Sequence, residues 1–255
     1  DEARILVRNA LRAVNFYGAE RMVRINQGER GLEDLEMVIP HNVHLILVPK
    51  CEDAETVRII DRKIRDIKDK EGQSERIFLM PIIESARGVE NAGEIAAASE
   101  SVVAMAIGLE DYTADLGVQR TKEGGESIYA RNRIVVASKA AGIQPIDSVF
   151  SDVGDMEGLL QNVLSAKAMG FEGMGCIHPR QIAVIRKGFS PSEEEMEKAK
   201  RIVLAYRDAR EKGLGVVALG TKMIDAPVVA RAEKTISLAV RLGLLPENWI
   251  EEEKA

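Results

Sequence analysis

Two acidic residues follow apolar segments in which no charge is expected. Glu84 ends the run at 77–83, and Asp111 comes just after the run at 102–109. Both runs have the length and composition of buried parallel strands, so we predict that the two acids lie at the same edge of one sheet. Carboxylate oxygens are the ligands that hard cations such as Mg²⁺ prefer. The pair therefore predicts a metal site and metal-assisted chemistry.

Each acid also has a simpler interpretation. A carboxylate after a strand is often the N-cap of the next helix, and either residue taken alone fits that role as well as it fits metal binding. Asp111 and Asp115 also fit as two residues at the entry of one helix. The elements around the pair decide which interpretation is favoured.

Strand-like runs with a polar residue at or near the end recur along the chain. The separations between the polar marker residues of successive runs are 26, 34, 27, 36 and 31 residues. They are close to the average of about 31 residues for one βα unit of a (β/α)8 barrel. Segments with helical periodicity lie between them, at 54–68, 88–98, 129–141 and 156–169. The predicted fold class is α/β, a TIM (β/α)8-type barrel with six βα units visible. The residues that mark the runs are Arg24, Lys50, Glu84, Asp111, Asp147 and His178.

The barrel inferred in this way is incomplete. A closed barrel of this type has eight strands, and the sequence opens in a helical pattern at 1–14 with no strand before it. We therefore expect two further strands ahead of it, about 40 to 60 residues by the same unit length. Any catalytic group that they carry lies outside this sequence.

The composition is typical of a globular enzyme. With 255 residues, of which 45% are hydrophobic, the chain can bury a substantial core. A net charge of −6 and a pI near 5.4 argue against nucleic acid as a partner. No apolar run is long enough to predict a membrane span. Cys51 and Cys176 show neither disulfide nor metal-site spacing, which favours a reducing, cytoplasmic location.

The pattern changes after Phe189. Residues 190–195 predict an N-cap with a capping box, followed by a helix to about Arg210. A short glycine-flanked β segment is predicted at 213–223, and a last helix at 228–242. We predict a barrel domain at 1–189, incomplete at its N-terminus, and a C-terminal helical lid segment at 190–255.

Asp225 is the acid of interest in this C-terminal segment. It stands before Ala226 and Pro227, where an N-cap belongs. The functional alternative is an acid on a lid that completes a site from outside the barrel. Both interpretations remain open from the sequence.

Seven motifs, in order and spread over essentially the whole chain, resemble the citrate lyase β-subunit and malyl-CoA lyase family, within the superfamily of HpcH/HpaI aldolases and citrate lyases. The similarity is specific for the family and less so for any one member. The motifs are Val23-Arg24-Ile25-Asn26, GLEDLE at 31–36, Val48-Pro49-Lys50, IESARG at 83–88, GLEDYTADLG at 108–117, CIHPRQI at 176–182 and KMIDAP at 222–227.

The resemblance implies a Mg²⁺-dependent carbon–carbon lyase, of the citryl-CoA lyase kind. Such an enzyme splits a 3-hydroxy acyl thioester into an acetyl thioester and a 2-oxo acid. The acyl group is citryl, malyl or citramalyl, and its carrier is coenzyme A or an acyl carrier protein. The resemblance also implies that the two expected N-terminal strands precede this sequence, the second ending in an acidic motif.

The resemblance also implies roles for four residues. Glu84 and Asp111 would hold Mg²⁺, with Glu84 close to the substrate. Arg24 would bind the substrate and stabilise a developing oxyanion, and Asp225 would be the catalytic acid, offered by the lid of a neighbouring subunit. The implied partners are further copies of the chain, in a trimer or hexamer, and the other subunits of a citrate lyase complex, including an acyl carrier protein.

Other residues have less specific signals. His178 fits either a substrate contact or a structural histidine before Pro179. Lys50 fits either a carboxylate contact or a solvated position at the mouth of the barrel, and we interpret Cys51 and Cys176 as packing residues. The loop at 124–125 is too weak a signal to assign a phosphate site, so the sequence does not locate the carrier.

Two other function classes share part of the pattern. A pyruvate-type class II aldolase, or a malate synthase-like thioester enzyme, would use the same carboxylate pair, but the KMIDAP motif favours the thioester lyase. A non-enzymatic scaffold subunit would not need Arg24, Glu84, Asp111 and Asp225 together.

Overall fold

The computed structural model describes residues 2–211, 213, 217–219 and 222–252. The chain forms two compact units, Asp1–Ile185 and Arg186–Ala255, which are described one at a time. The division falls within helix α9 (Pro179–Phe189). The roles of the two parts as barrel and lid remain a prediction.

The strands of the first unit form one parallel sheet in chain order. Each strand pairs with the next, as in the register of Leu45 with Phe78 and of Ile82 with Ala106. Because every crossover adds its strand on the same side, the sheet curls as in a (β/α) barrel instead of growing both ways from a central strand. Within the described residues it has six strands: β1 (Met22–Arg24), β2 (Leu45–Val48), β3 (Phe78–Ile83), β4 (Ala104–Ile107), β5 (Gln144–Asp147) and β6 (Gly173–Met174).

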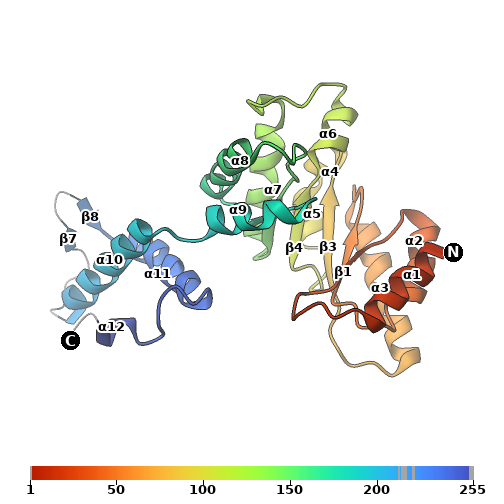
Figure 1. Cartoon of the computed structure of the whole chain (residues 1–255), viewed down its shortest axis with the longest axis horizontal. Helices are drawn as coiled ribbons and strands as arrows, with labels where there is room; N and C mark the ends of the chain where they lie inside the picture. The colour runs from red at the N-terminus through yellow and green to blue at the C-terminus, as the bar shows by residue number, and fades with distance from the viewer. Residues whose placement is uncertain (1, 212, 214–216, 220–221, 253–255) are drawn as a thin grey trace. The chain divides into compact units, whose positions relative to one another are not determined.

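Helices connect these strands, as the predicted βα repeat requires. Figure 1 shows α1, α2 and α3 near the edge of the sheet formed by β1, and α7 and α8 toward the opposite edge. Besides α9, the first unit contains α1 (Glu2–Ala13), α2 (Gly28–Val38), α3 (Ala54–Glu71), α4 (Ala86–Glu90), α5 (Ala92–Ala96), α6 (Leu109–Leu116), the 3-10 turn η1 (Gly125–Ser127), α7 (Ile128–Ala140) and α8 (Met156–Met169).

The two faces of the sheet differ in how they are packed. Side chains alternate between faces along each strand. On one face Leu79 and Met105 are completely buried, as expected where helices cover a parallel sheet. On the other, concave face a smaller cluster forms the interior of the curled sheet. Its buried members are Leu45, Met80, Ala104 and Ala106.

Short polar and glycine signals set the ends of the longer helices. The side chains of Asp53 and Asp155 accept backbone N–H groups at the starts of α3 and α8. Gly72 and Gly170 end the same two helices in the left-handed conformation, which only glycine adopts without strain. The elements that hold the strand ends in place are therefore encoded locally.

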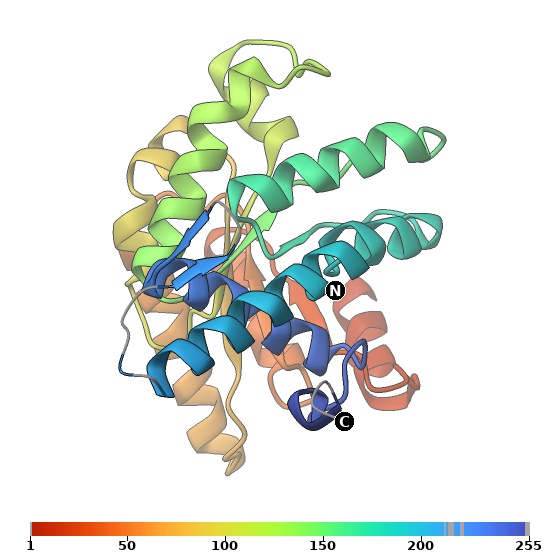
Figure 2. The same cartoon turned by 90° about the vertical axis from the view of Figure 1, so that its left-hand side faces the viewer.

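The second unit has its own core. Helix α10 (Glu193–Glu211) packs against α11 (Ala226–Arg241), and β7 (Val217–Leu219) pairs antiparallel with β8 (Lys222–Ile224) before the short helix α12 (Trp249–Glu252). Figure 2 shows the β7–β8 hairpin and α10 from the side. The predicted capping box is confirmed, because Ser192 and Glu195 exchange hydrogen bonds between their side chains and backbone N–H groups.

Two details differ from the sequence-based expectations, and part of a third expectation is not described by the structure. The helix predicted at 88–98 is two short helices, α4 and α5, separated at Asn91. Strand β4 ends at Ile107, so Asp111 lies in the first turn of α6 instead of at the strand end. Residues 214–216 and 220–221 of the predicted β segment lie outside the described residues.

Candidate metal and substrate site

Glu84 lies just beyond the end of β3. Side chains alternate between the faces of a strand, so Glu84 continues the concave face to which Ile82 and Ala106 belong. Its carboxylate rests against Gly108, where an added Cβ atom would stand 2.6 Å from Oε1 of Glu84. The glycine therefore makes the space that this carboxylate occupies.

Asp111 and Glu84 meet through Lys50. The backbone N–H of Lys50 donates to Oε2 of Glu84 at 2.8 Å. The Nζ atom of the same lysine lies 2.9 Å from Oδ1 of Asp111. The two acids that the sequence singled out are thus brought to one place, at the carboxyl ends of β2, β3 and β4.

The charges around Glu84 act in opposite directions. Burial raises the pKa of its carboxyl group, and the nearby carboxylate of Asp111 raises it further. The hydrogen bond from the Lys50 backbone and the positive charges of Lys50 and Arg24 lower it, but the net pKa shift is upward. The carboxylate pair is therefore stabilised by any additional cation placed beside it.

Arg24 lies on the same face of the sheet. It pairs in register with Leu47, a concave-face residue, and partners in a parallel pair point the same way. The influence of Arg24 on the Glu84 pKa places its guanidinium within electrostatic range of that carboxylate. No hydrogen bond or ion pair joins it to another described residue, so its five donors are available to a ligand.

The residues present fit a magnesium ion. Asp111 already pairs with one cationic group, the Lys50 ammonium, and Glu84 accepts the backbone N–H of the same residue, so both acids offer hard oxygen ligands at one place. Among the described residues no group of three or more His, Cys, Asp or Glu side chains forms a possible metal site. A pair is sufficient for Mg²⁺, which is commonly bound by one or two carboxylates and completes its shell with water and substrate oxygens.

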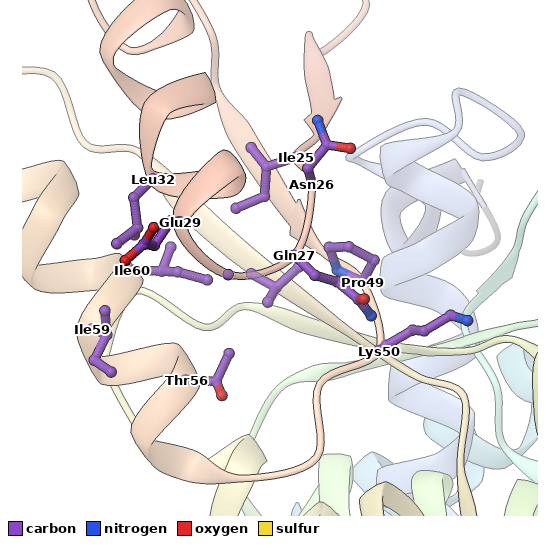
Figure 3. Close-up of a pocket in the computed structure, with 12 residues that line it drawn as sticks. Ile25, Asn26, Gln27, Glu29, Leu32, Pro49, Lys50, Thr56, Ile59 and Ile60 are labelled. Atoms are coloured by element: carbon purple, nitrogen blue, oxygen red, sulfur yellow. The ribbon is translucent and has the colours of Figure 1, made fainter.

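A cavity of about 380 Å³ opens beside the Lys50 turn, between α2, α3 and the ends of β1 and β2. Figure 3 shows Ile59 and Ile60 on one side of it and the Lys50 side chain pointing away from them. Thr56, Gln27 and Asn26 add polar groups to the lining. Lys50 is the residue that this cavity shares with the carboxylate pair, and neither Glu84 nor Asp111 lines it.

Asp225 lies in the second unit and caps α11. Its Oδ1 atom accepts the backbone N–H of Val228 at 3.2 Å. The capping interpretation of the sequence is therefore confirmed for this residue. Its predicted catalytic role stays a prediction, because a capping carboxylate retains a second oxygen for other contacts.

Asp147 ends β5 but belongs to the structure of the barrel and not to the site. Its carboxylate makes two hydrogen bonds with the guanidinium of Arg131, at 2.6 and 3.2 Å, and the two side chains are only 2% and 8% exposed. Breaking such a buried pair usually costs about 3–5 kcal/mol. Asp115, on α6, accepts the backbone N–H of Ala86 and so fixes the start of α4.

The less specific candidates also have clear places. His178 accepts the backbone N–H of Arg180 through Nδ1, a structural contact at the start of α9. Cys51 is buried, which raises the pKa of its thiol to about 12 and confirms the packing interpretation. The same interpretation is wrong for Cys176, which lies just after the short strand β6 and is exposed, with its thiol donating to the carbonyl of His178.

Of the two alternatives given for Lys50, the carboxylate contact is confirmed, because its ammonium pairs with Asp111. The sequence did not reveal two other features of the site. Lys50 has a left-handed backbone with φ of 46°, and the Gly108 position must lack a side chain. A lysine with positive φ has no sequence signature. Gly108, in contrast, directly follows an apolar strand and precedes an acidic helix start, a pattern that marks close backbone approach.

The fold and the site together define a (β/α)-barrel enzyme with a carboxylate pair at the carboxyl end of its strands, the end at which barrel enzymes carry their active sites. Residues 1–179 match the family model described as HpcH/HpaI aldolase/citrate lyase. The chain belongs to this family, which confirms the resemblance inferred from its motifs.

Individual relatives agree with this assignment. The chain is 37% identical to the citrate lyase subunit beta of Leuconostoc mesenteroides subsp. cremoris, over 99% of this chain and 85% of that protein. It is 32% identical to the mitochondrial citramalyl-CoA lyase of Homo sapiens, over 95% and 75% of the two chains. The crystal structure of CitE from Mycobacterium tuberculosis in complex with magnesium, acetoacetate and coenzyme A matches with a TM-score of 0.74 and 30% identity, covering 93% of this chain and 83% of that one.

In the described part of the chain, no helix is both long and apolar enough to cross a membrane. The predicted location in the cytoplasm stays a prediction.

Proposed function

We propose that this protein is a Mg²⁺-dependent carbon–carbon lyase that cleaves a 3-hydroxy acyl thioester into an acetyl thioester and a 2-oxo acid. The observation that carries the proposal is that Glu84 and Asp111 contact the same residue, Lys50, at the carboxyl end of the sheet, Glu84 through its backbone N–H and Asp111 through its ammonium. Relatives named citrate lyase and citramalyl-CoA lyase, and a related structure with magnesium and coenzyme A, support it.

Glu84 and Asp111 would hold the metal ion. When bound, the ion supplies Lewis-acid polarisation of substrate oxygens and a fixed template for the substrate. The two carboxylates keep it at the carboxyl end of β3 and at the start of α6. Glu84 also borders the space that the substrate would fill, because it faces the concave side of the sheet.

Arg24 would bind and stabilise the substrate. As the carbon–carbon bond breaks, the hydroxyl group gives its proton to water, its oxygen becomes the carbonyl of the 2-oxo acid, and the electron pair of the bond passes to the acetyl thioester. A guanidinium that bonds to no other described residue offers fixed donors to the oxygen on which charge develops. Removing one such donor elsewhere costs about 3–4 kcal/mol in transition-state stabilisation.

Asp225 would protonate the acetyl carbon. The electron pair left on that carbon after cleavage needs a proton, and an acid brought from outside the barrel would deliver it. We propose that the active form is a homo-oligomer, a trimer or hexamer, in which Asp225 serves the barrel of a neighbouring subunit. A citrate lyase complex with an acyl carrier protein is the corresponding larger assembly.

A substrate panel tests the reaction class. Citryl, malyl and citramalyl thioesters, on coenzyme A and on acyl carrier protein, are incubated with the full-length protein, and release of oxaloacetate, glyoxylate or pyruvate is followed by absorbance. We expect cleavage of at least one thioester and dependence on Mg²⁺. Activity on free hydroxy-oxo acids with none on thioesters would establish the aldolase alternative instead.

Removal of either carboxylate tests the metal site. We expect Glu84→Ala and Asp111→Ala each to lower kcat/KM by about a thousand-fold or more, because Lewis-acid stabilisation supplies several kcal/mol. Circular dichroism should show an intact fold. Glu94→Ala removes an exposed acid on α5 and serves as the matched control. Unchanged turnover and Mg²⁺ affinity in both site variants would remove the proposed metal site.

A further inference from the structure

Lys50 contacts both carboxylates with different groups. Its backbone N–H donates to Oε2 of Glu84, and its ammonium pairs with Oδ1 of Asp111. The contact with Glu84 comes from the backbone and the contact with Asp111 from the side chain, so one residue holds both acids. The double contact indicates a specific role at this site.

The backbone of Lys50 is held in a strained conformation. Its φ of 46° lies in the left-handed region, which costs a residue with a Cβ atom about 1–3 kcal/mol. The next residue, Cys51, is buried and donates its N–H to the carbonyl of Ile82 in β3, so the turn is anchored to the sheet. The strained turn is what directs the N–H of Lys50 at Glu84.

One oxygen of each carboxylate remains available. Within the described residues, Oε1 of Glu84 and Oδ2 of Asp111 accept no hydrogen bond. Each carboxylate therefore has one oxygen that contacts Lys50 and one oxygen that is open to a ligand.

We propose that Lys50 is a positioning residue that sets the ion selectivity of the site. By occupying one oxygen of each carboxylate, it leaves Glu84 and Asp111 one oxygen each for the metal and disfavours binding through both oxygens. Mg²⁺ takes few protein oxygens and keeps its waters, whereas Ca²⁺ takes six to eight oxygens, often from both oxygens of a carboxylate. The inference rests on the proposed function, because it assumes that this pair binds the metal.

The test compares Mg²⁺ and Ca²⁺ binding to wild type and to Lys50→Met by calorimetry. Removing the ammonium also removes a positive charge, which favours both divalent ions alike and cancels in the ratio of their dissociation constants. We expect this ratio to shift toward Ca²⁺ by on the order of ten-fold, the lower end of the effect seen for groups that orient metal ligands. A ratio that stays at the wild-type value would overturn the inference.

Two further variants separate this role from a structural one. Lys50→Gly keeps the backbone N–H and tolerates the left-handed turn, so it should show the same shift in the ratio without loss of thermal stability. Lys139→Met removes a cation that pairs with Glu172 away from the site, and should leave the ratio unchanged. A shift in Lys139→Met as large as that in Lys50→Met would assign the effect to net charge and overturn the inference.

These measurements distinguish failure of the role of Lys50 from failure of the proposed metal site. If wild type binds Mg²⁺, if Glu84→Ala abolishes that binding, and if Lys50→Met leaves the ratio unchanged, only the role of Lys50 fails. If wild type binds neither ion, the proposed metal site and the role of Lys50 fail together.

Discussion

At the scale of single residues, the site depends on one carboxylate pair and on groups that hold it. Glu84 is half-buried beside a second acid, and its raised pKa reports the resulting cost of carrying a negative charge there. The hydrogen bond from Lys50 reduces that cost, and the absence of a side chain at Gly108 leaves room for the carboxylate. The pair is thus organised to receive a cation.

Filling the space at Gly108 is expected to disable the site without unfolding the protein. In Gly108→Ala the new methyl group would stand 2.6 Å from Oε1 and 2.7 Å from Cγ of Glu84, so the carboxylate must move. The backbone at this position, with φ of −110°, accepts alanine. We expect Mg²⁺ affinity, measured by calorimetry, to fall by about ten-fold or more.

The control for this substitution is Gly93→Ala. A Cβ atom there meets only Arg133, at 3.8 Å, an ordinary contact, and alanine in a helix is more stable than glycine by about 0.5–1 kcal/mol. Mg²⁺ affinity should be unchanged in this variant. Equal affinities in Gly108→Ala and wild type would show that the position of the Glu84 carboxylate does not matter for binding.

The sequence predicted some of these residues and not others, for physical reasons. Glu84 and Asp111 were predictable because a charge next to an apolar strand contradicts the local pattern. Asp147 gave a similar signal, but its partner Arg131 is a helical residue whose buried approach depends on the tertiary fold. A carboxylate contact was one of the two alternatives given for Lys50, and it is observed with Asp111. The left-handed backbone of Lys50 was not predictable, because a side chain with a Cβ atom disfavours it.

At the scale of elements, a buried carboxylate joins the helices on either side of β1. Asp34, on α2, accepts hydrogen bonds from the backbone and side-chain N–H groups of Asn26, both at 2.8 Å, and from Nε of Arg4 on α1 at 2.6 Å. Burial alone would raise the pKa of Asp34, but these hydrogen bonds and the Arg4 charge outweigh it and lower the pKa. The residue after Arg24 and Ile25 is thereby fixed.

We expect Asp34→Asn to lose stability in a pH-dependent way. A carboxylate whose pKa is lower in the folded than in the unfolded chain contributes stability above the unfolded value, 3.8, and loses it as the pH falls through the folded value. At neutral pH the variant should be less stable by about 1–3 kcal/mol. Urea unfolding should show the difference shrinking from about pH 5 to about pH 3.

The control for Asp34→Asn is Asp66→Asn, which changes an exposed carboxyl group on α3 and should alter stability by less than about 0.5 kcal/mol. A stability difference for Asp34→Asn that stays constant over the acidic range would contradict the role of its ionised form.

Element types were more predictable than their ends. The helix at 156–169 was predicted as observed, because Asp155 and Gly170 mark its two ends. The break at Asn91 was missed because that position carries neither proline nor glycine. The end of β4 at Ile107 was missed although Gly108 follows it, because Leu109 continues the apolar run. The parallel order of the strands followed from their even spacing, since each interval leaves room for one crossover helix.

At the scale of the whole molecule, the proposed residues are divided between the two units. Arg24, Glu84 and Asp111 belong to the first unit, and Asp225 belongs to the second. The second unit has its own core, in which α10 and α11 pack together around Ile202, Val203 and Ile236. An acid on a separately packed unit can serve the barrel of its own subunit or the barrel of another. We propose that Asp225 serves the barrel of another subunit.

Subunit exchange between two inactive variants distinguishes these cases. Arg24→Ala removes the substrate contact from one barrel, and Asp225→Asn removes the acid while an asparagine still caps α11. If Asp225 serves a neighbouring barrel, random mixing at equal amounts pairs an intact barrel with an intact lid at roughly a quarter of the sites. We expect activity of mixed oligomers to approach that fraction of wild type, whereas each variant alone stays inactive. Exchange is verified by mass spectrometry of tagged subunits, and mixed oligomers without activity would place Asp225 in the site of its own subunit or outside catalysis.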